Sequence, residues 1–163
     1  MARVLIVGCG CRGQALAREL ISAGHAVRGT TRDPAGTAAI AGAGAEPYVG
    51  DPDRIATLME GLAAVSVVVW LLGTARGPSE AVAALHGPRL RMLCEKVVDT
   101  PVRGLVYEGA GTVAADVLEA GRMIATAAHE TWQIPLEVLT RDPADFEPWL
   151  AAATGAVDRL LSP

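Results

Sequence analysis

Apolar runs alternate with amphipathic stretches along this chain, beginning close to its first residue. The apolar run Val4–Val7 leads into a glycine-rich turn, and the segment 14–23 then repeats apolar residues at helical spacing. A second short stretch, Ala26–Thr31, follows. A short apolar run bounded by turn residues indicates a strand, and the helical spacing indicates a helix. The opening of the chain therefore predicts a strand, a tight turn, a helix and a second strand.

The same alternation continues to the end of the sequence. Further strands are predicted at Glu46–Val49, Ala64–Leu72, Arg103–Tyr107 and Ile134–Leu139. Helices are predicted at Pro34–Ala43, Pro52–Leu62, Glu80–Val98 with an interruption at His86-Gly87-Pro88, Ala114–Thr131 and Asp145–Leu161. Strands that alternate with helices favour a parallel sheet covered on both faces. We therefore expect an α/β fold, a doubly wound parallel sheet of about six strands (Rossmann-like), in a single domain spanning residues 1–163.

Length and composition narrow the class of protein. The 163 residues suit one domain, and they are 51% hydrophobic but only 4% aromatic, so Ala, Val and Leu must form the core. A formal net charge of −4 provides no basic surface for nucleic acid or for an anionic membrane, and neither partner is expected. The longest apolar run, Val65–Leu72 with Ser66 inside it, is far too short to span a bilayer.

Cysteine usage and the N-terminus indicate the compartment. Cys9 and Cys11 lie in a turn that should face a ligand, a poor place for a structural disulfide, and Cys94 falls among apolar helix positions where we expect it to be buried. Met1 runs almost directly into the first strand and leaves no room for a secretory signal. We therefore expect a reduced, cytoplasmic protein. Two cysteines without further clustered ligands do not make a zinc site, so no metal is expected.

The turn after the first predicted strand is the strongest indication of function. Gly8, Gly10 and Gly13 have the GxGxxG spacing of dinucleotide-binding folds, placed between a strand and a helix as that motif requires. The first glycine permits the turn, the second lets the backbone approach a diphosphate, and the third lets helix and strand pack closely. The helix N-terminus adds unpaired N–H groups and a partial positive charge. We predict nucleotide binding here, with a ligand-free tight turn as the alternative.

The end of the second predicted strand indicates which cofactor is bound. An acidic residue there would bind the ribose 2′-OH of NAD, whereas an arginine accommodates the 2′-phosphate of NADP. The sequence has Thr30, Thr31 and Arg32 at this place, two hydroxyls and a guanidinium without a carboxylate. NADP is therefore favoured, with NAD possible. Asp33 is a competing candidate for the ribose, but Pro34 after it favours a role as the N-cap of the next helix.

Two further strand ends complete the expected site. Asp51 precedes a proline and is predicted to cap the helix that begins there, a role compatible with an adenine contact. The fourth predicted strand ends in Leu72, Gly73 and Thr74. Open α/β sheets bind ligands at this edge, so these residues are expected to lie along the cofactor. Arg76 in the same loop is a candidate contact for a phosphate or a substrate anion, with a solvated loop arginine as the alternative.

The most distinctive motifs resemble those of a known superfamily. VLIVGCGCRG and GHAVRGTTR in the opening stretch, GDPDR at Gly50–Arg54 and a fourth strand ending in Leu-Gly resemble the extended and atypical short-chain dehydrogenase/reductase superfamily, in particular its NAD(P)-binding, epimerase-related proteins. The resemblance implies a Rossmann fold that binds a nicotinamide dinucleotide. By motif position it implies cofactor contacts at Gly8, Gly10, Cys11, Arg12, Gly13, Thr31, Arg32, Asp51, Leu72 and Gly73.

The catalytic signature of that superfamily is absent. Its members use a tyrosine with a lysine four residues later, which lowers the pKa of the tyrosine, and a Ser or Thr at the end of strand five. Tyr48 and Tyr107 both lack that lysine, and the only lysine of the chain, Lys96, follows no tyrosine at that spacing. Where the family often has a Ser-Ser pair, the sequence reads EGAGT over Glu108–Thr112.

Three functions are compatible with these residues. The first is an NADP-preferring dinucleotide-binding or redox-sensing module, or a subunit whose partner completes a site, since active members of the superfamily extend well beyond this length. The second is a reductase or epimerase-like oxidoreductase in which Glu108, Thr112 or a water transfers the proton, although a loop glutamate and a helix-capping threonine are simpler roles. The third is an interaction protein with an empty nucleotide site. A small-molecule substrate, a protein partner and a homo-oligomer all remain open.

Overall fold

The computed structural model describes residues 1–163 and contains one six-stranded sheet. Its strands are β1 (Arg3–Val7), β2 (Ala26–Thr31), β3 (Glu46–Val49), β4 (Val67–Trp70), β5 (Leu105–Glu108) and β6 (Leu136–Leu139). All neighbouring strands are parallel, in the order β3-β2-β1-β4-β5-β6. The direction in which strands are added reverses between β1 and β4, which makes this pair the switch point of the sheet. The predicted doubly wound α/β fold is confirmed.

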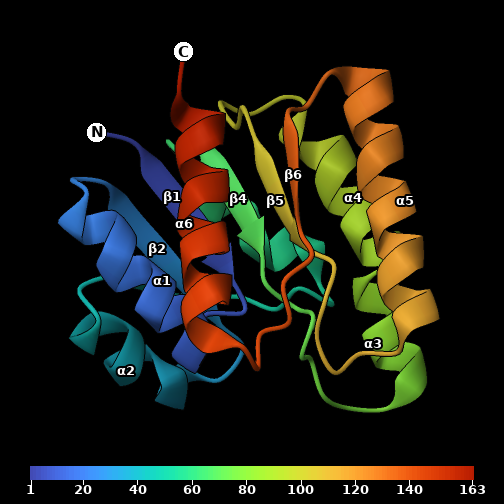
Figure 1. The fold of residues 1–163 in the computed structure, drawn as a ribbon, viewed down its shortest axis with the longest axis horizontal. Helices are drawn as coiled ribbons and strands as arrows, with labels where there is room; N and C mark the ends of the chain where they lie inside the picture. The colour runs from blue at the N-terminus through green and yellow to red at the C-terminus, as the bar shows by residue number, and fades with distance from the viewer.

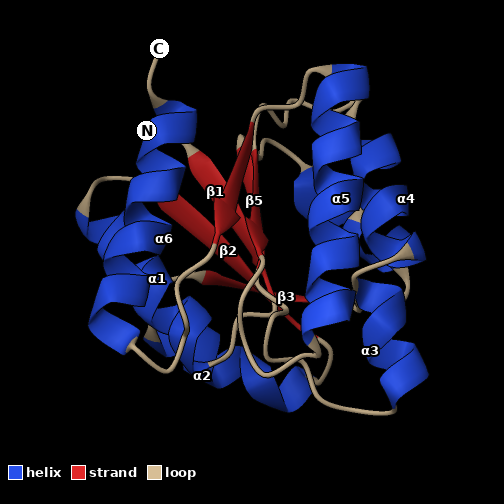
Figure 2. Cartoon of the chain, turned by 45° about the vertical axis from the view of Figure 1, so that its right-hand side comes forward, coloured by secondary structure: helices blue, strands red, loops and turns tan.

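Helices cover both faces of the sheet (Figure 1). One layer consists of α1 (Cys11–Ser22), α2 (Thr37–Gly42) and α6 (Phe146–Leu161), and the other of α3 (Ser79–Leu85), α4 (Pro88–Val97) and α5 (Ala115–Trp132). Figure 2 shows the strands between these two layers. Three short 3-10 segments complete the fold: η1 (Pro34–Gly36), η2 (Ile55–Leu58) and η3 (Glu60–Leu62). None of the helices combines the length and the apolar character that crossing a bilayer requires.

The central strands are apolar on both faces because each face supports a separate core. In β4, Val68 and Trp70 pack with α3, α4 and α5, whereas Val67 and Val69 pack with α1 and α6. Alternate residues of a strand point to opposite faces, so a strand buried on both faces reads as a continuous apolar run. The large Trp70 ring is completely buried, and its indole N–H donates to the carbonyl oxygen of Leu85 at 3.1 Å.

The predicted helix over 52–62 is wrong, because two 3-10 segments replace it. The Arg28 guanidinium, which comes from β2, donates hydrogen bonds to two backbone carbonyl oxygens at the end of this region, those of Gly61 at 2.6 Å and Ala63 at 3.2 Å. These hydrogen bonds fix the backbone there in a conformation other than an α-helix. Asp51 therefore caps no helix, and its carboxylate instead accepts from the backbone N–H of Asp53 at 2.9 Å.

Smaller corrections concern the ends of other elements. β5 begins and ends later than predicted, so Glu108 is its last residue rather than the first residue of the following loop. Thr112 does not cap α5, whose N-cap is Ala114 without a side-chain hydrogen bond. The predicted cap at Asp33 is confirmed, since its carboxylate accepts from the N–H of Ala35 at 2.9 Å at the start of η1.

Candidate functional site

A cleft of about 540 Å³ opens at the carboxyl ends of the strands around the switch point. This volume lies in the range of small-molecule sites, roughly 300–1,000 Å³. Most of the predicted cofactor-binding residues line it: Gly8, Gly10, Cys11, Arg12, Gly13, Thr30, Thr31, Arg32, Leu72 and Thr74. Asp51 and Gly73 do not line the cleft, although residues adjacent to each of them do.

The glycine turn is built as its motif predicts. Gly8 has a φ of +84°, and a Cβ there would lie 2.7 Å from the carbonyl oxygen of Leu71. Gly13 packs with its α-carbon against Ile6, where a Cβ would lie 3.2 Å from the side chain. A Cβ on Gly10, by contrast, would meet nothing within 4 Å. The first and third glycines are therefore required by the fold, while the second borders open space where a ligand can approach the backbone.

Thr30 and Thr31, the last two residues of β2, form hydrogen bonds with backbone groups of the protein. The Thr30 side chain is buried, and its hydroxyl accepts from the N–H of Gly8 at 3.1 Å. The Thr31 hydroxyl donates to the carbonyl oxygen of Asp33 at 2.9 Å. Among the three residues predicted to hold a 2′-phosphate, only Arg32 has a side chain that is exposed and forms no ion pair.

The cleft favours anions although the chain as a whole is acidic. Its lining includes Arg12, Arg32 and Arg76 but no aspartate or glutamate. Arg76 is exposed and unpaired, like Arg32. Cationic groups gathered in a concave site attract anionic ligands more strongly than the same groups spread over a surface. The N-terminus of α1 adds its unpaired N–H groups to the same cleft.

Arg12 lines the cleft but is held by protein groups. Its guanidinium forms a two-pronged ion pair with Glu108 at the end of β5 and donates to the Thr74 hydroxyl at 2.7 Å. It also lies over the indole ring of Trp149, with 4.9 Å between the guanidinium carbon and the ring centroid. The Arg12 side chain is 19% exposed and that of Glu108 is 0% exposed. Arg12 therefore joins the start of α1 to the loop after β4, to the end of β5 and to α6.

Glu108 has its full set of partners within the protein. Besides Arg12, its carboxylate accepts from the N–H of Gly73 at 2.8 Å and from the indole N–H of Trp149 at 3.0 Å. It does not line the cleft, and neither does the exposed Thr112. The two candidate proton donors thus lie away from the space where a ligand fits.

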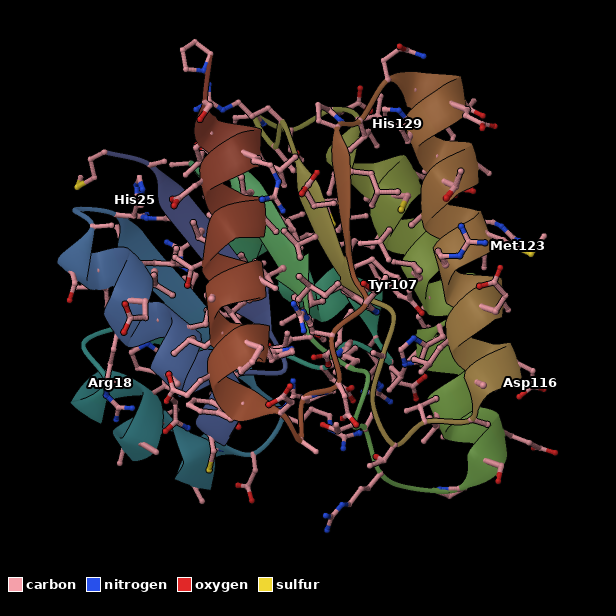
Figure 3. All side chains as sticks on the ribbon, in the orientation of Figure 1. Arg18, His25, Tyr107, Asp116, Met123 and His129 are labelled. Carbon is pink, nitrogen blue, oxygen red and sulfur yellow. The ribbon has the colours of Figure 1, made fainter.

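A buried pair that the sequence did not reveal lies on the other face of the sheet. Tyr107 and His86 are both fully buried, with 2.7 Å between the tyrosine oxygen and His86 Nδ1. His86 Nε2 lies 2.9 Å from the carbonyl oxygen of Leu72, and the Tyr107 hydroxyl lies 3.1 Å from that of Leu118. Figure 3 shows Tyr107 inside the molecule, whereas Asp116 points outward from α5.

Burial controls the protonation of this pair. It lowers the pKa of His86 below its ordinary value, more than the hydrogen bond to Leu72 and the nearby charge of Glu108 raise it. Burial also raises the pKa of Tyr107, with a further contribution from Glu108. Neutral His86 donates from Nε2 to the Leu72 carbonyl oxygen, which leaves Nδ1 as an acceptor; the single proton of the Tyr107 hydroxyl faces both Nδ1 and the Leu118 carbonyl oxygen. Tyr107 is therefore a core residue, and its pKa is raised, whereas a catalytic tyrosine needs a lowered pKa.

Neither a family model nor a curated protein matches this sequence. Solved structures do resemble it. A short-chain dehydrogenase/reductase superfamily protein from Agrobacterium tumefaciens with bound NAD is 18% identical, with a TM-score of 0.68 over 83% of this chain and 48% of that one. A putative NAD-dependent epimerase/dehydratase from Bacillus halodurans is 16% identical, with a TM-score of 0.72 over 88% and 71%.

A third similar structure carries the other nicotinamide cofactor. The Citrobacter sp. triphenylmethane reductase complexed with NADP(H) is 19% identical, with a TM-score of 0.63 over 84% of this chain and 48% of that one. The chain thus spans about half the length of two of these proteins. At such identities the likeness concerns architecture. The structure therefore has the Rossmann fold seen in short-chain dehydrogenase/reductase and epimerase/dehydratase proteins, which confirms at the level of fold the resemblance found in the sequence.

Proposed function

We propose that this protein binds a nicotinamide dinucleotide in the cleft at the switch point, prefers NADP to NAD, and acts as a dinucleotide-binding module without the Tyr/Lys catalytic pair. Arg32 is the observation on which the preference rests. It lies directly after β2, lines the cleft and has no ion-pair partner. An arginine at this place accommodates the 2′-phosphate, and no carboxylate in the cleft repels it.

The geometry of the other polar groups supports binding rather than turnover. Glu108 already accepts from Arg12, Gly73 and Trp149, and Thr112 lies outside the cleft. Tyr107, a residue of β5, is fully buried and does not line the cleft. A proton donor must reach the reacting atom directly or through one water. The reductase and epimerase activities named for the similar structures therefore remain the alternative function for this chain.

Thermal-shift titration with NADPH, NADP, NADH and NAD tests the proposal. Stabilisation that grows with ligand concentration indicates binding to the folded state. We expect the phosphorylated cofactors to act at lower concentration than NADH and NAD. No stabilisation by any of the four would refute the proposal and favour an interaction protein with an empty site.

The Arg32→Ala variant tests the preference, and Arg18→Ala is its matched control. Arg18 lies on α1, is exposed and is absent from the cleft lining, so its removal changes the net charge equally. Arg32→Ala should weaken NADP binding by about tenfold or more, the effect of losing roughly 1.4 kcal/mol, and NAD binding much less. Equal losses for both cofactors would contradict the role of Arg32.

Incubating the protein with NADPH and a panel of aldehydes, ketones and quinones then measures any turnover.

A further inference from the structure

The ends of β5 and β6 do not contribute to the lining of the cleft. Its walls come from the β1–α1 turn, the ends of β2 and β3, the start of α2, the loop after β4 and Leu85 at the end of α3. A Rossmann crevice receives a dinucleotide across both halves of its sheet. In this protein the open half is the one built on β1, β2 and β3, with β4 at its border.

The loops that follow β4 and β5 are closed against each other. The N–H of Val113 donates to the carbonyl oxygen of Gly73 at 3.0 Å. A Cβ on Gly73 would collide with the carbonyl oxygen of Ala110, and a Cβ on Gly111 would collide with the backbone of Gly73. Two backbones in direct contact leave no space for an aromatic ring between them.

Arg12 and Glu108 fill the corner beneath these loops. The guanidinium extends from the first turn of α1 to the Thr74 hydroxyl and to Glu108 at the buried end of β5. The Trp149 ring packs against this guanidinium, and its indole N–H donates to Glu108. Moving Arg12 aside would leave the Glu108 carboxylate buried without its counter-charge, which is strongly unfavourable. The corner is therefore fixed by an ion pair and is not a space that a ligand readily opens.

We infer that the protein holds its ligand through the 2′-phosphorylated adenosine diphosphate half and leaves the nicotinamide ring outside the closed corner. Arg32 binds the 2′-phosphate, and Arg76 together with the α1 N-terminus binds the diphosphate. This inference rests on the proposed function and specifies its ligand class: a 2′-phospho-ADP-ribose group, with or without nicotinamide. A site of this kind does not distinguish the oxidised from the reduced cofactor.

Calorimetric titration of the full chain with NADP, NADPH and 2′-phospho-ADP-ribose tests the inference directly. We expect the three dissociation constants to agree within about fivefold. A larger loss for 2′-phospho-ADP-ribose, or a larger difference between NADP and NADPH, would overturn it. If none of the three binds, the proposed function itself fails. If the two dinucleotides bind and 2′-phospho-ADP-ribose does not, only the inference fails.

The Arg76→Ala variant, with Arg18→Ala as control, gives an independent measurement. Because Arg76 is exposed and unpaired, its replacement should leave the fold intact. NADP and 2′-phospho-ADP-ribose should lose affinity by the same factor, since both carry the diphosphate. A loss confined to NADP would place Arg76 on the nicotinamide half and overturn the inference.

Saturation-transfer NMR on bound NADP should show strong transfer to the adenine protons and weak transfer to the nicotinamide protons; equal transfer would also overturn it.

Discussion

Replacing Glu108 by glutamine should destabilise the protein far more than the same change elsewhere. The Glu108 carboxylate is 0% exposed and accepts hydrogen bonds from three different elements, through Arg12, Gly73 and Trp149. A glutamine keeps the shape but has only one acceptor oxygen, so its amide N–H groups face the donors of Arg12 or Trp149. The guanidinium also loses its counter-charge in a largely buried corner.

The size of the effect follows from burial. Removing one partner of a buried ion pair costs about 3–5 kcal/mol. For a chain of this length each kcal/mol lowers the melting temperature by roughly 2–4 °C, so we expect a decrease of about 6–20 °C. Domains have a total free energy of unfolding of about 5–15 kcal/mol, which exceeds this loss over most of that range, so the variant should still fold at low temperature.

Glu137→Gln is the matched control for the Glu108→Gln change. Glu137 also pairs with an arginine distant in sequence, Arg159, at 2.6 Å, but those side chains are 28% and 63% exposed. Exposed pairs contribute about 0–1 kcal/mol. Calorimetry or circular dichroism at one pH measures both variants. Melting temperatures of the two variants within about 2 °C of each other would refute the role assigned to the buried pair.

Three further predictions concern other buried groups. Burial lowers the pKa of His86 below its ordinary 6.5, so the unfolded chain takes up this proton first, and stability should fall as the pH falls below about 6.5, by at most about 1.4 kcal/mol per pH unit; denaturant titrations at pH 7.5 and 5.5 should show this loss in the wild type and a smaller one in His86→Asn. Cys9 and Cys94 are buried with pKa values raised to about 12, whereas Cys11 is exposed and lines the cleft; a thiol reagent should therefore modify Cys11 alone in the native state, and NADPH should slow that reaction, while rapid modification of all three would contradict the structure. Gly8→Ala should cost more than about 1 kcal/mol, because φ is +84° and the backbone of β4's end blocks a Cβ; unchanged thermal stability would show that the turn adapts.

Much of the fold could be predicted because local patterns and tertiary structure agree in it. All four residues of β4 are apolar because both faces of that strand are buried. Gly8 and Gly13 are glycines because backbone or side chains occupy the place of a Cβ. In each case the residue type records its own surroundings, so the sequence is sufficient.

The parts that could not be predicted depend on partners distant along the chain. The helical pattern over 52–62 contains nothing that reveals Arg28, whose guanidinium takes the carbonyl oxygens of Gly61 and Ala63. Trp149 fits the apolar face of α6, and only the folded structure brings its indole N–H to Glu108. Long-range side-chain contacts of this kind leave no periodic signal in a sequence.

The same dependence explains how the end of β5 can differ from the superfamily that the sequence resembles. The resemblance implies a Ser or Thr at the end of strand five, whereas here that position is Glu108, whose side chain is fully buried. A buried carboxylate is tolerated only with donors and a counter-charge, so Arg12 and Trp149 are conditions of its presence. The substitution Glu108→Ser would leave the Arg12 guanidinium without its counter-charge, with only the Thr74 hydroxyl as an acceptor, and a void beside the Trp149 indole. A proton donor at this place would therefore require changes at Arg12 and Trp149 as well as at Glu108, because the three side chains form one buried network at the border of the cleft.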